Sequence, residues 1–333
     1  MPDLNWGGGS GVFYRALGRT GLQISEVGFG AWGIGNTGWV GADDGESIRA
    51  LNRAIDLGCN FIDTALEYGA GHSEKLVGEV VRGRNETVYV ATKIPPKNRI
   101  WPARPGTPVS EAFPADHVIA CTERSLANLG LDTINVQQFH VWSDEWVGEG
   151  DWLEAVQKLK DQGKIRHFGI SINDHEPNNA LKLIETGVVD TVQVIYNMFD
   201  QSPEDQLLPA CQKHNVGVIV RVALDEGGLT GRITPETTFP EGDFRASYFA
   251  GDRKKEVYER VQRIASDLGI GLEDMPEAAL RYVLSHPAVS TVIPGMRTVR
   301  NVERNMAVGD GKGLPAGKIA KVKPHRWVRN FYQ

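Results

Sequence analysis

Residues 61–93, FIDTALEYGAGHSEKLVGEVVRGRNETVYVATK, contain two short β-rich runs separated by a stretch with helical character. We predict strands over residues 61–63 and 87–92. Similar runs, each followed by a stretch with helical periodicity, recur along the chain, and this alternation is typical of parallel strands joined by helices that cover the sheet. The other predicted strands are residues 27–30, 135–139, 167–170, 191–195, 217–222 and 289–293.

Eight strands with crossover helices close more naturally into an α/β TIM (β/α)8 barrel than into an open sheet. A Rossmann fold is disfavoured, because no Gly-x-Gly-x-x-Gly opens a helix directly after the first strand. The turn at residues 18–21 predicts an N-terminal β-hairpin. We expect a flexible lead-in over residues 1–12 and a single barrel domain over residues 13–333. Long loops over residues 94–114 and 224–251 should leave the carboxyl ends of strands, where barrel enzymes build active sites.

The bulk composition narrows the possible partners and compartment. The chain has 42 acidic and 36 basic residues, a net charge of -6, without a long run of one sign. We therefore expect no nucleic-acid or membrane partner, and no particular oligomeric state is indicated. No apolar stretch approaches the ~20 residues of a membrane span, and no signal-peptide pattern begins the chain. Three scattered cysteines, Cys59, Cys121 and Cys211, fit reduced buried thiols, which favours the cytoplasm.

Four polar residues lie at or just after neighbouring predicted strand ends: Asp63, Tyr68, Lys93 and His140. Each alone is more often a surface or capping residue, but the carboxyl ends of barrel strands meet at one mouth. A phenol, with a pKa of roughly 10, donates protons poorly at neutral pH unless a cation stabilises its anion. Lys93 can supply that cation, Asp63 can keep Lys93 charged, and His140 can orient a substrate oxygen. This chemistry requires no metal.

The motifs around these four residues resemble those of the aldo-keto reductase family, in its bacterial-type short-loop branch, over residues 13–310. They are FIDTA (61–65), EYG (67–69), HSE (72–74), ATK (91–93) and QFH (138–140). The resemblance implies that Asp63, Tyr68, Lys93 and His140 form the family's catalytic tetrad. It also implies an extended nicotinamide cofactor and reversible hydride transfer between that cofactor and a small aldehyde or ketone.

The same resemblance implies a set of cofactor contacts. Ser171 and Gln193 match the residues that hold the nicotinamide carboxamide, and LDEGGLTGR (224–232) resembles the loop around the pyrophosphate. A helix that follows Pro294 and Gly295 would favour an anion at its start, and arginines suit a phosphate. These arginines favour NADPH over NADH. The expected contacts are Gly30, Trp32, Ser171, Gln193, Arg221, Leu224, Gly231, Arg232, Pro294, Gly295, Arg297, Arg304 and Asn305, with Arg300 beside them.

The chain departs from the family pattern at two of these positions. Arg221 stands where many relatives stack an aromatic ring on the nicotinamide, and its guanidinium could lie flat on that ring. Arg304 stands where relatives have a glutamate before Asn305. For the substrate pocket we expect aromatic side chains near the strand ends and in the tail, although core packing would explain each one equally well. They are Trp32, Trp101, Trp142, Tyr196, Phe199, Trp327, Phe331 and Tyr332.

Two other functions are compatible with a barrel of this kind. A Schiff-base aldolase could use Lys93 as its nucleophile, but Tyr68 and the phosphate-binding segment would then have no role. A nucleotide-sensing regulatory subunit, like the potassium-channel β subunits that share this fold, would retain the cofactor with negligible turnover. We favour the reductase.

Overall fold

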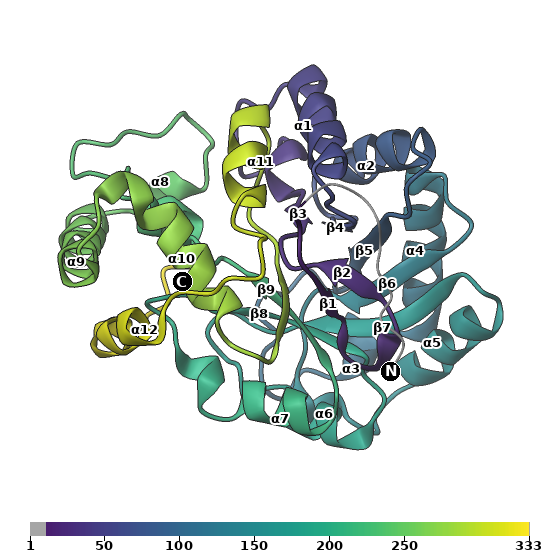
Figure 1. Cartoon of the computed structure of the whole chain (residues 1–333). Helices are drawn as coiled ribbons and strands as arrows, with labels where there is room; N and C mark the ends of the chain where they lie inside the picture. The colour runs from purple at the N-terminus through teal and green to yellow at the C-terminus, as the bar shows by residue number, and fades with distance from the viewer. Residues whose placement is uncertain (1–10, 333) are drawn as a thin grey trace, which may run out of the picture.

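The fold is a barrel of parallel strands, seen in a computed structural model that describes residues 11–332 (Figure 1). Eight strands follow one another around a single sheet in the order β10-β9-β8-β7-β6-β5-β4-β3. Bridges between Val27 and Val292 and between Gly30 and Gly295 join the first strand to the last. The hydrogen bond from Gly28 N to the carbonyl oxygen of Val292, 2.9 Å long, belongs to this seam. The predicted TIM barrel is therefore confirmed.

The strands lie where the sequence predicts them, with shifts of one or two residues at half of the strand ends. The prediction is met in full at β4 and β8, whereas β5 begins later and ends at Ile94. Strands buried on both faces read as continuous apolar runs, which explains why their existence was clearer than their ends. The barrel strands are β3 (Phe29–Gly30), β4 (Phe61–Asp63), β5 (Tyr89–Ile94), β6 (Ile134–Phe139), β7 (Ile165–Ser171), β8 (Thr191–Ile195), β9 (Gly217–Arg221) and β10 (Val289–Val292).

Helices surround most of the barrel, and α9 and α12 pack on one another to one side of it (Figure 1). In α1 the side chain of Asp43 caps the first turn, where its carboxylate accepts a hydrogen bond from Glu46 N at 2.8 Å. The α-helices are α1 (Asp44–Asp56), α2 (His72–Arg82), α3 (Val109–Ala112), α4 (Ala115–Leu129), α5 (Trp152–Asp161), α6 (Leu181–Thr186), α7 (Leu207–Lys213), α8 (Arg245–Tyr248), α9 (Arg253–Leu268), α10 (Met275–Leu284), α11 (Val299–Met306) and α12 (Ala316–Val322). The short 3-10 segments are η1 (Gly18–Thr20), η2 (Trp32–Ile34), η3 (Asp144–Trp146), η4 (Ser202–Glu204), η5 (Asp225–Thr230), η6 (Leu272–Asp274) and η7 (Lys323–His325).

The predicted hairpin closes the amino end of the barrel. Strands β1 (Tyr14–Ala16) and β2 (Gln23–Ser25) pair antiparallel and lie across the ring of strands in Figure 1. Gly18 has a φ of +52°, and a Cβ there would lie 2.2 Å from Gly217 N, so this close approach requires glycine. The hairpin's apolar residues form one cluster with residues inside the barrel: Leu17, Leu22, Ile24, Phe61, Ala91, Val136, Ile219 and Ile293.

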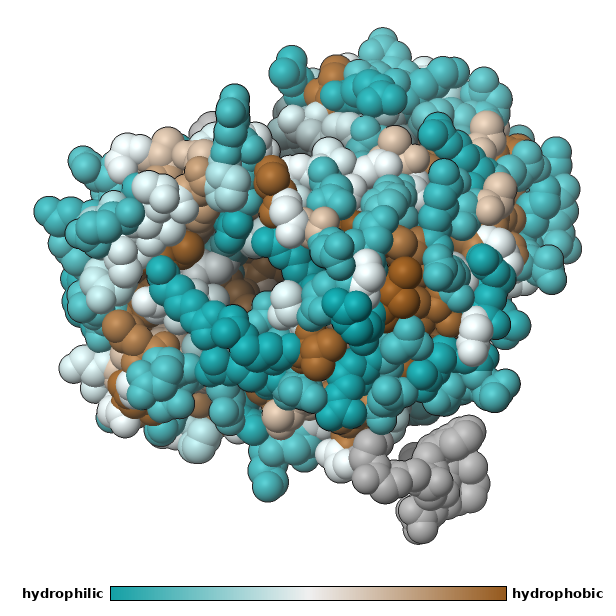
Figure 2. All heavy atoms as spheres, turned by 90° about the horizontal axis from the view of Figure 1, so that it is seen from above, coloured by the Kyte–Doolittle hydropathy of each residue, from teal (hydrophilic) through white to brown (hydrophobic). Residues whose placement is uncertain are grey.

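The two long loops leave the carboxyl ends of β5 and β9, as expected. The first contains α3, and the second contains η5 and α8. The flexible lead-in expected over residues 1–12 lies, up to residue 10, outside the described part of the chain. Within residues 11–332, none of the helices combines the length and apolar character of a membrane span. Figure 2 shows one face of the molecule as mostly hydrophilic, with hydrophobic residues in separate small groups.

Candidate active site

The carboxyl ends of three neighbouring strands bring the four candidate residues together. Asp63 ends β4, Lys93 lies near the end of β5, and His140 follows β6. Lys93 Nζ lies 2.5 Å from Asp63 Oδ1 and 3.2 Å from the hydroxyl of Tyr68. The rings of Tyr68 and His140 meet edge to face with their centroids 5.8 Å apart. Asp63 and Lys93 are buried, whereas Tyr68 and His140 are half-buried and face the mouth of the barrel.

Burial and charge act in opposite directions on the two proton-carrying groups. Burial lowers the pKa of Lys93, but the carboxylate of Asp63 and the phenol of Tyr68 raise it, so the pKa stands above its usual value. Burial raises the pKa of Tyr68, and the opposing effect of Lys93 is smaller. Lys93 therefore favours the phenolate, as expected, but offsets only part of the burial effect. At neutral pH the phenol is protonated and the amine is charged.

His140 is a neutral imidazole at neutral pH. Burial lowers its pKa well below the usual value, and the positive charges of Lys93 and Arg221 act in the same direction. Its backbone N–H donates to the carbonyl oxygen of Ile94 at 2.9 Å. Its Nδ1 is buried and has no hydrogen-bond partner within residues 11–332. A neutral imidazole can donate one hydrogen bond to an oxygen in the mouth.

Two buried amides bind the second oxygen of Asp63. Gln193 Nε2 donates to Asp63 Oδ2 at 2.8 Å, and Gln138 Nε2 donates to the same oxygen at 3.2 Å. The family resemblance gave Gln193 a cofactor contact but gave Gln138 no role. The signal for Gln138 was its position two residues before His140, since residues i and i+2 of a strand share a face.

Only some of the expected pocket aromatics lie at the mouth. The ring of Trp32 is 6.2 Å from that of Tyr68, and the ring of Trp101 is 5.6 Å from that of His140. Trp142 is fully buried, and its ring neighbours are core aromatics, including Trp146 at 5.7 Å. Tyr196 and Phe199 are buried as well, and the hydroxyl of Tyr196 donates to Glu204 at 2.7 Å. For these three residues the structure shows core packing.

Two of the residues that we expect near the nicotinamide are the last residues of different strands. Ser171 ends β7 and is buried, and Arg221 ends β9. Arg221 Nη2 donates to Asp174 Oδ1 at 2.7 Å and to the carbonyl oxygen of Ile172 at 3.0 Å, while its buried Nε has no partner within residues 11–332. Gly30 and Pro294 share a backbone hydrogen bond of 3.1 Å at the barrel seam.

The loop after β9 is held by the C-terminal tail. Asp225 and Glu226 both have positive φ, at 53° and 52°, in η5, between Leu224 and Gly231. Arg329 forms a buried ion pair with Asp225 at 2.7 Å, and the hydroxyl of Tyr332 donates to Glu226. Of the other expected tail residues, Trp327 packs on Phe199 and Phe331 on Tyr248. Arg232 is exposed.

The expected arginines of α11 take different positions. Arg304 is exposed, and its Nη2 donates to the carbonyl oxygen of Glu273 at 3.0 Å, while Asn305 beside it is buried. Arg300 is also exposed. Arg297 is half-buried, follows Gly295 and donates to the carbonyl oxygen of Val40 at 3.0 Å.

A second arginine, Arg245, accompanies Arg297. Their Cζ atoms lie 4.2 Å (Arg245) and 5.7 Å (Arg297) from the ring centroid of Trp39. Burial lowers the pKa of Arg297, and the charge of Arg245 lowers it further. Arg245 also pairs with the buried carboxylate of Asp243 at 2.8 Å and 2.7 Å, and the net positive charge that remains beside the start of α11 fits a bound phosphate. Sequence reasoning missed Arg245, because it belongs to a loop whose path across the mouth is set by contacts such as Phe244 N to Gly38 O at 2.8 Å.

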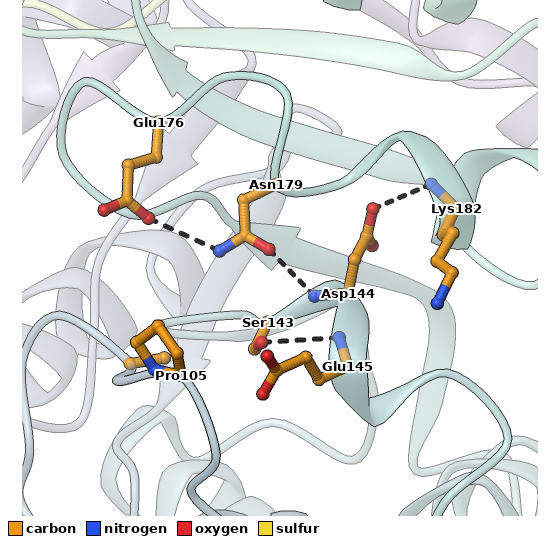
Figure 3. Close-up of a pocket in the computed structure, with 8 residues that line it drawn as sticks. Pro105, Ser143, Asp144, Glu145, Glu176, Asn179 and Lys182 are labelled. Atoms are coloured by element: carbon orange, nitrogen blue, oxygen red, sulfur yellow. Dashed lines mark hydrogen bonds between the residues drawn. The ribbon is translucent and has the colours of Figure 1, made fainter.

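A polar cavity of about 310 Å³ lies beside the mouth, between the loops that follow β5, β6 and β7 (Figure 3). Its polar groups bind one another: Asn179 Oδ1 accepts from Asp144 N, and Asp144 Oδ2 accepts from Lys182 N, both at 2.8 Å. The tetrad does not line it. Its lining residues are Ala103, Pro105, Ser143, Asp144, Glu145, Glu176, Asn179 and Lys182.

Comparison with known proteins agrees with this architecture. The model of the aldo/keto reductase family matches residues 26–326. Aldo-keto reductase YhdN of Bacillus subtilis (strain 168) is 30% identical over 299 residues, which cover 87% of this chain and 86% of that protein. The holo form of aldo-keto reductase AKR11C1 from Bacillus halodurans has a TM-score of 0.74 at 26% identity, with 97% of this chain and 100% of that chain covered. Glycerol dehydrogenase AKR11B4 from Gluconobacter oxydans has a TM-score of 0.75 at 28% identity, with 94% of each chain covered. The chain therefore belongs to the aldo/keto reductase family and is a nicotinamide-dependent oxidoreductase.

Proposed function

We propose that this protein is an NADPH-dependent reductase of small aldehydes or ketones in which Tyr68 is the general acid. One observation carries the proposal. The hydroxyl of Tyr68 lies 3.2 Å from Lys93 Nζ at the barrel mouth, and that amine lies 2.5 Å from Asp63. A phenol held against a buried ammonium is suited to deliver a proton to an oxygen that gains negative charge.

Each member of the tetrad then has a distinct role. Tyr68 donates its proton to the substrate oxygen as the alkoxide forms, and Lys93 stabilises the phenolate that remains. Asp63 keeps Lys93 charged within the buried site. His140, neutral at physiological pH, donates a hydrogen bond that directs the carbonyl oxygen towards Tyr68. In the reverse direction, the phenolate of Tyr68 accepts the proton of an alcohol.

The residues at the mouth fit a nicotinamide dinucleotide. When bound, NADPH supplies the hydride that reduces the carbonyl carbon. Ser171 and Gln193 would hold its carboxamide; Gln193 Oε1 forms no hydrogen bond within residues 11–332 and can accept one. Arg221 would lie beside the nicotinamide ring. Further residues that the family resemblance assigns to the cofactor would contact the rest of the dinucleotide as it extends across the mouth. They are in particular Leu224, Gly231, Arg232, Gly295 and Asn305.

The paired arginines support a preference for NADPH. Arg297 and Arg245 both lie against Trp39. Arg297 donates through Nη1 to the carbonyl oxygen of Val40, and Arg245 donates through Nε and Nη2 to Asp243, so each guanidinium has further N–H groups that can bind a phosphate. Together they would bind the 2′-phosphate, which NADH lacks. Titration with each cofactor in parallel tests this preference, and equal affinities would contradict it.

The rings of Trp32 and Trp101, which lie beside Tyr68 and His140, favour a small carbonyl compound with an apolar portion. The three free cysteines favour a cytoplasmic protein.

The decisive experiment is the Tyr68→Phe substitution. The variant should bind NADPH about as tightly as the wild type, because the hydroxyl belongs to the proton relay. Reduction should fall by roughly 10²- to 10⁴-fold, the usual contribution of a positioned general acid. The assay is the loss of NADPH absorbance over a panel of aldehydes, ketones and sugars. Ordinary turnover by the variant would refute the role of Tyr68, and a wild type that retains cofactor without turnover would indicate a regulatory subunit instead.

A further inference from the structure

The second oxygen of Asp63 has its own buried ligands, and one of them has no part in the reaction as described so far. We infer that Gln138 is a positioning residue: its amide holds the Asp63 carboxylate so that the other oxygen faces Lys93. The inference rests on the proposed function, because the Asp63–Lys93 pair is the one that assists Tyr68.

The contacts divide the carboxylate between two sets of donors. Lys93 Nζ donates to Asp63 Oδ1 at 2.5 Å, while Gln138 and Gln193 donate to Oδ2 at 3.2 Å and 2.8 Å. Gln138 lies directly across from Lys93 in the register of β6 and β5, and its side chain is completely buried. The pairing of β5 with β6 therefore fixes the donors on both oxygens of the carboxylate, Lys93 for Oδ1 and Gln138 for Oδ2.

Both ends of the Gln138 amide are used inside the protein. Its Nε2 binds Asp63, and its Oε1 accepts from Gln193 Nε2 at 3.5 Å. Gln193, in contrast, forms its side-chain hydrogen bonds within residues 11–332 through Nε2, so its Oε1 can accept a hydrogen bond from a ligand. Gln138 therefore acts on the reaction only through Asp63 and its neighbour, which distinguishes a positioning residue from a binding one.

A carboxylate at this place needs such a restraint. The terminal torsion of an aspartate has a broad energy profile, so its partners decide how the carboxylate is turned. If the carboxylate turns, the Lys93 ammonium is left in a buried site with a weaker counter-charge, and it loses its proton at a lower pH.

The test is Gln138→Met, which keeps the length of the side chain and removes the hydrogen bonds. We expect kcat for carbonyl reduction to fall about tenfold, the size of effect that a lost hydrogen bond to a charged group produces. The alkaline limb of the pH profile should move to lower pH by about one pH unit. Affinity for NADPH should stay within about twofold.

The matched control is Gln137→Met on the same strand. Gln137 is also buried, but neither atom of its amide has a partner within residues 11–332, so its pH profile should match the wild type. Gln138→Glu supplies a second signature. Its protonated carboxyl can donate to Asp63 at low pH and partly restore activity, whereas ionisation at higher pH places two like charges together and abolishes it.

Crystal structures of wild type and Gln138→Met provide a readout that does not require turnover. The inference predicts a turned Asp63 carboxylate and a longer Oδ1–Nζ distance in the variant. An unchanged pH profile together with an unchanged carboxylate would overturn it. Failure of the wild type to reduce any carbonyl compound would instead refute the proposed function, and the crystal structures would still decide the role of Gln138.

Discussion

At the scale of single residues, the proposed role of the pair Asp63–Lys93 sets the chemistry of a buried charge against its cost to stability. Both side chains are almost fully buried, and the ion pair is 2.5 Å long. Breaking such a pair by removing one partner leaves an uncompensated charge in the protein interior. In the proposed mechanism the ammonium therefore has two tasks: it stabilises the phenolate of Tyr68 and it compensates the buried carboxylate of Asp63.

This dual role separates stability from activity in a pair of variants. Lys93→Met should lower the free energy of unfolding by about 3–5 kcal/mol, because Asp63 remains charged and unpaired. Adding Asp63→Asn removes that charge and should restore most of the stability, while reduction stays lost in both proteins. Urea denaturation and the NADPH assay measure the two properties. A double variant as unstable as Lys93→Met would show that the carboxylate is not the cause.

The position of the four proposed catalytic residues at one end of the barrel could be predicted from the sequence, because Asp63, Lys93 and His140 lie at strand ends and Tyr68 lies in the loop that follows Asp63. The position of Arg245 could not be predicted, because it depends on how the loop after β9 crosses the barrel mouth, and no local sequence pattern encodes that path. Trp142 lies only two residues beyond His140, yet its ring packs into the core at 5.3 Å from the ring of Trp152. The direction of an aromatic side chain beyond a strand end follows from tertiary packing, which spacing alone does not reveal.

At the scale of elements, the eight strands were predictable because each is a short apolar run bounded by helical periodicity. The C-terminal tail was not, because its partners are far away in sequence. Arg329 lies 104 residues from Asp225, and the two are paired in a buried site. The tail therefore holds the loop that the family resemblance assigns to the pyrophosphate.

The tail and this loop should make stability depend on pH. Burial raises the pKa of Glu226 to about 7, above its usual 4.5, despite the hydrogen bond from Tyr332. The folded protein therefore holds this proton between pH 4.5 and about 7, where the unfolded chain has released it. Stability from this group is present below pH 4.5 and declines as pH rises through about 7.

Glu226→Gln removes the titrating group while it keeps a hydrogen-bonding side chain. At pH 8 the variant should be more stable than the wild type, by at most about 3 kcal/mol, whereas near pH 5 the difference should be small. Thermal unfolding between pH 5 and 9 gives the comparison. Glu236→Gln, at an exposed position, is the control. Parallel curves for Glu226→Gln and the wild type would contradict the raised pKa.

At the scale of the whole molecule, the hairpin that packs into the barrel and the proposed active site lie at opposite ends of the strands. The hairpin plugs the amino end with Leu17, Leu22 and Ile24, all buried against residues inside the barrel. The tetrad and the loops that would bind the cofactor are at the carboxyl end. Barrel enzymes tolerate changes of loop at one end because the strands and the packing beneath them stay fixed.

This separation predicts that Ile24→Ala and Tyr68→Phe have opposite effects. Ile24 is fully buried in the hairpin cluster, so truncation leaves a cavity and should cost about 2–5 kcal/mol in the free energy of unfolding. Below its unfolding transition, the variant should keep kcat and KM within about twofold, because the hairpin covers the amino end of the barrel and the four proposed catalytic residues lie at the carboxyl end. Tyr68→Phe should do the reverse, with near-normal unfolding and little reduction. Denaturant titration and steady-state kinetics on both proteins test the prediction, and a large loss of kcat in a folded Ile24→Ala protein would show that the plug and the active site are coupled through the barrel.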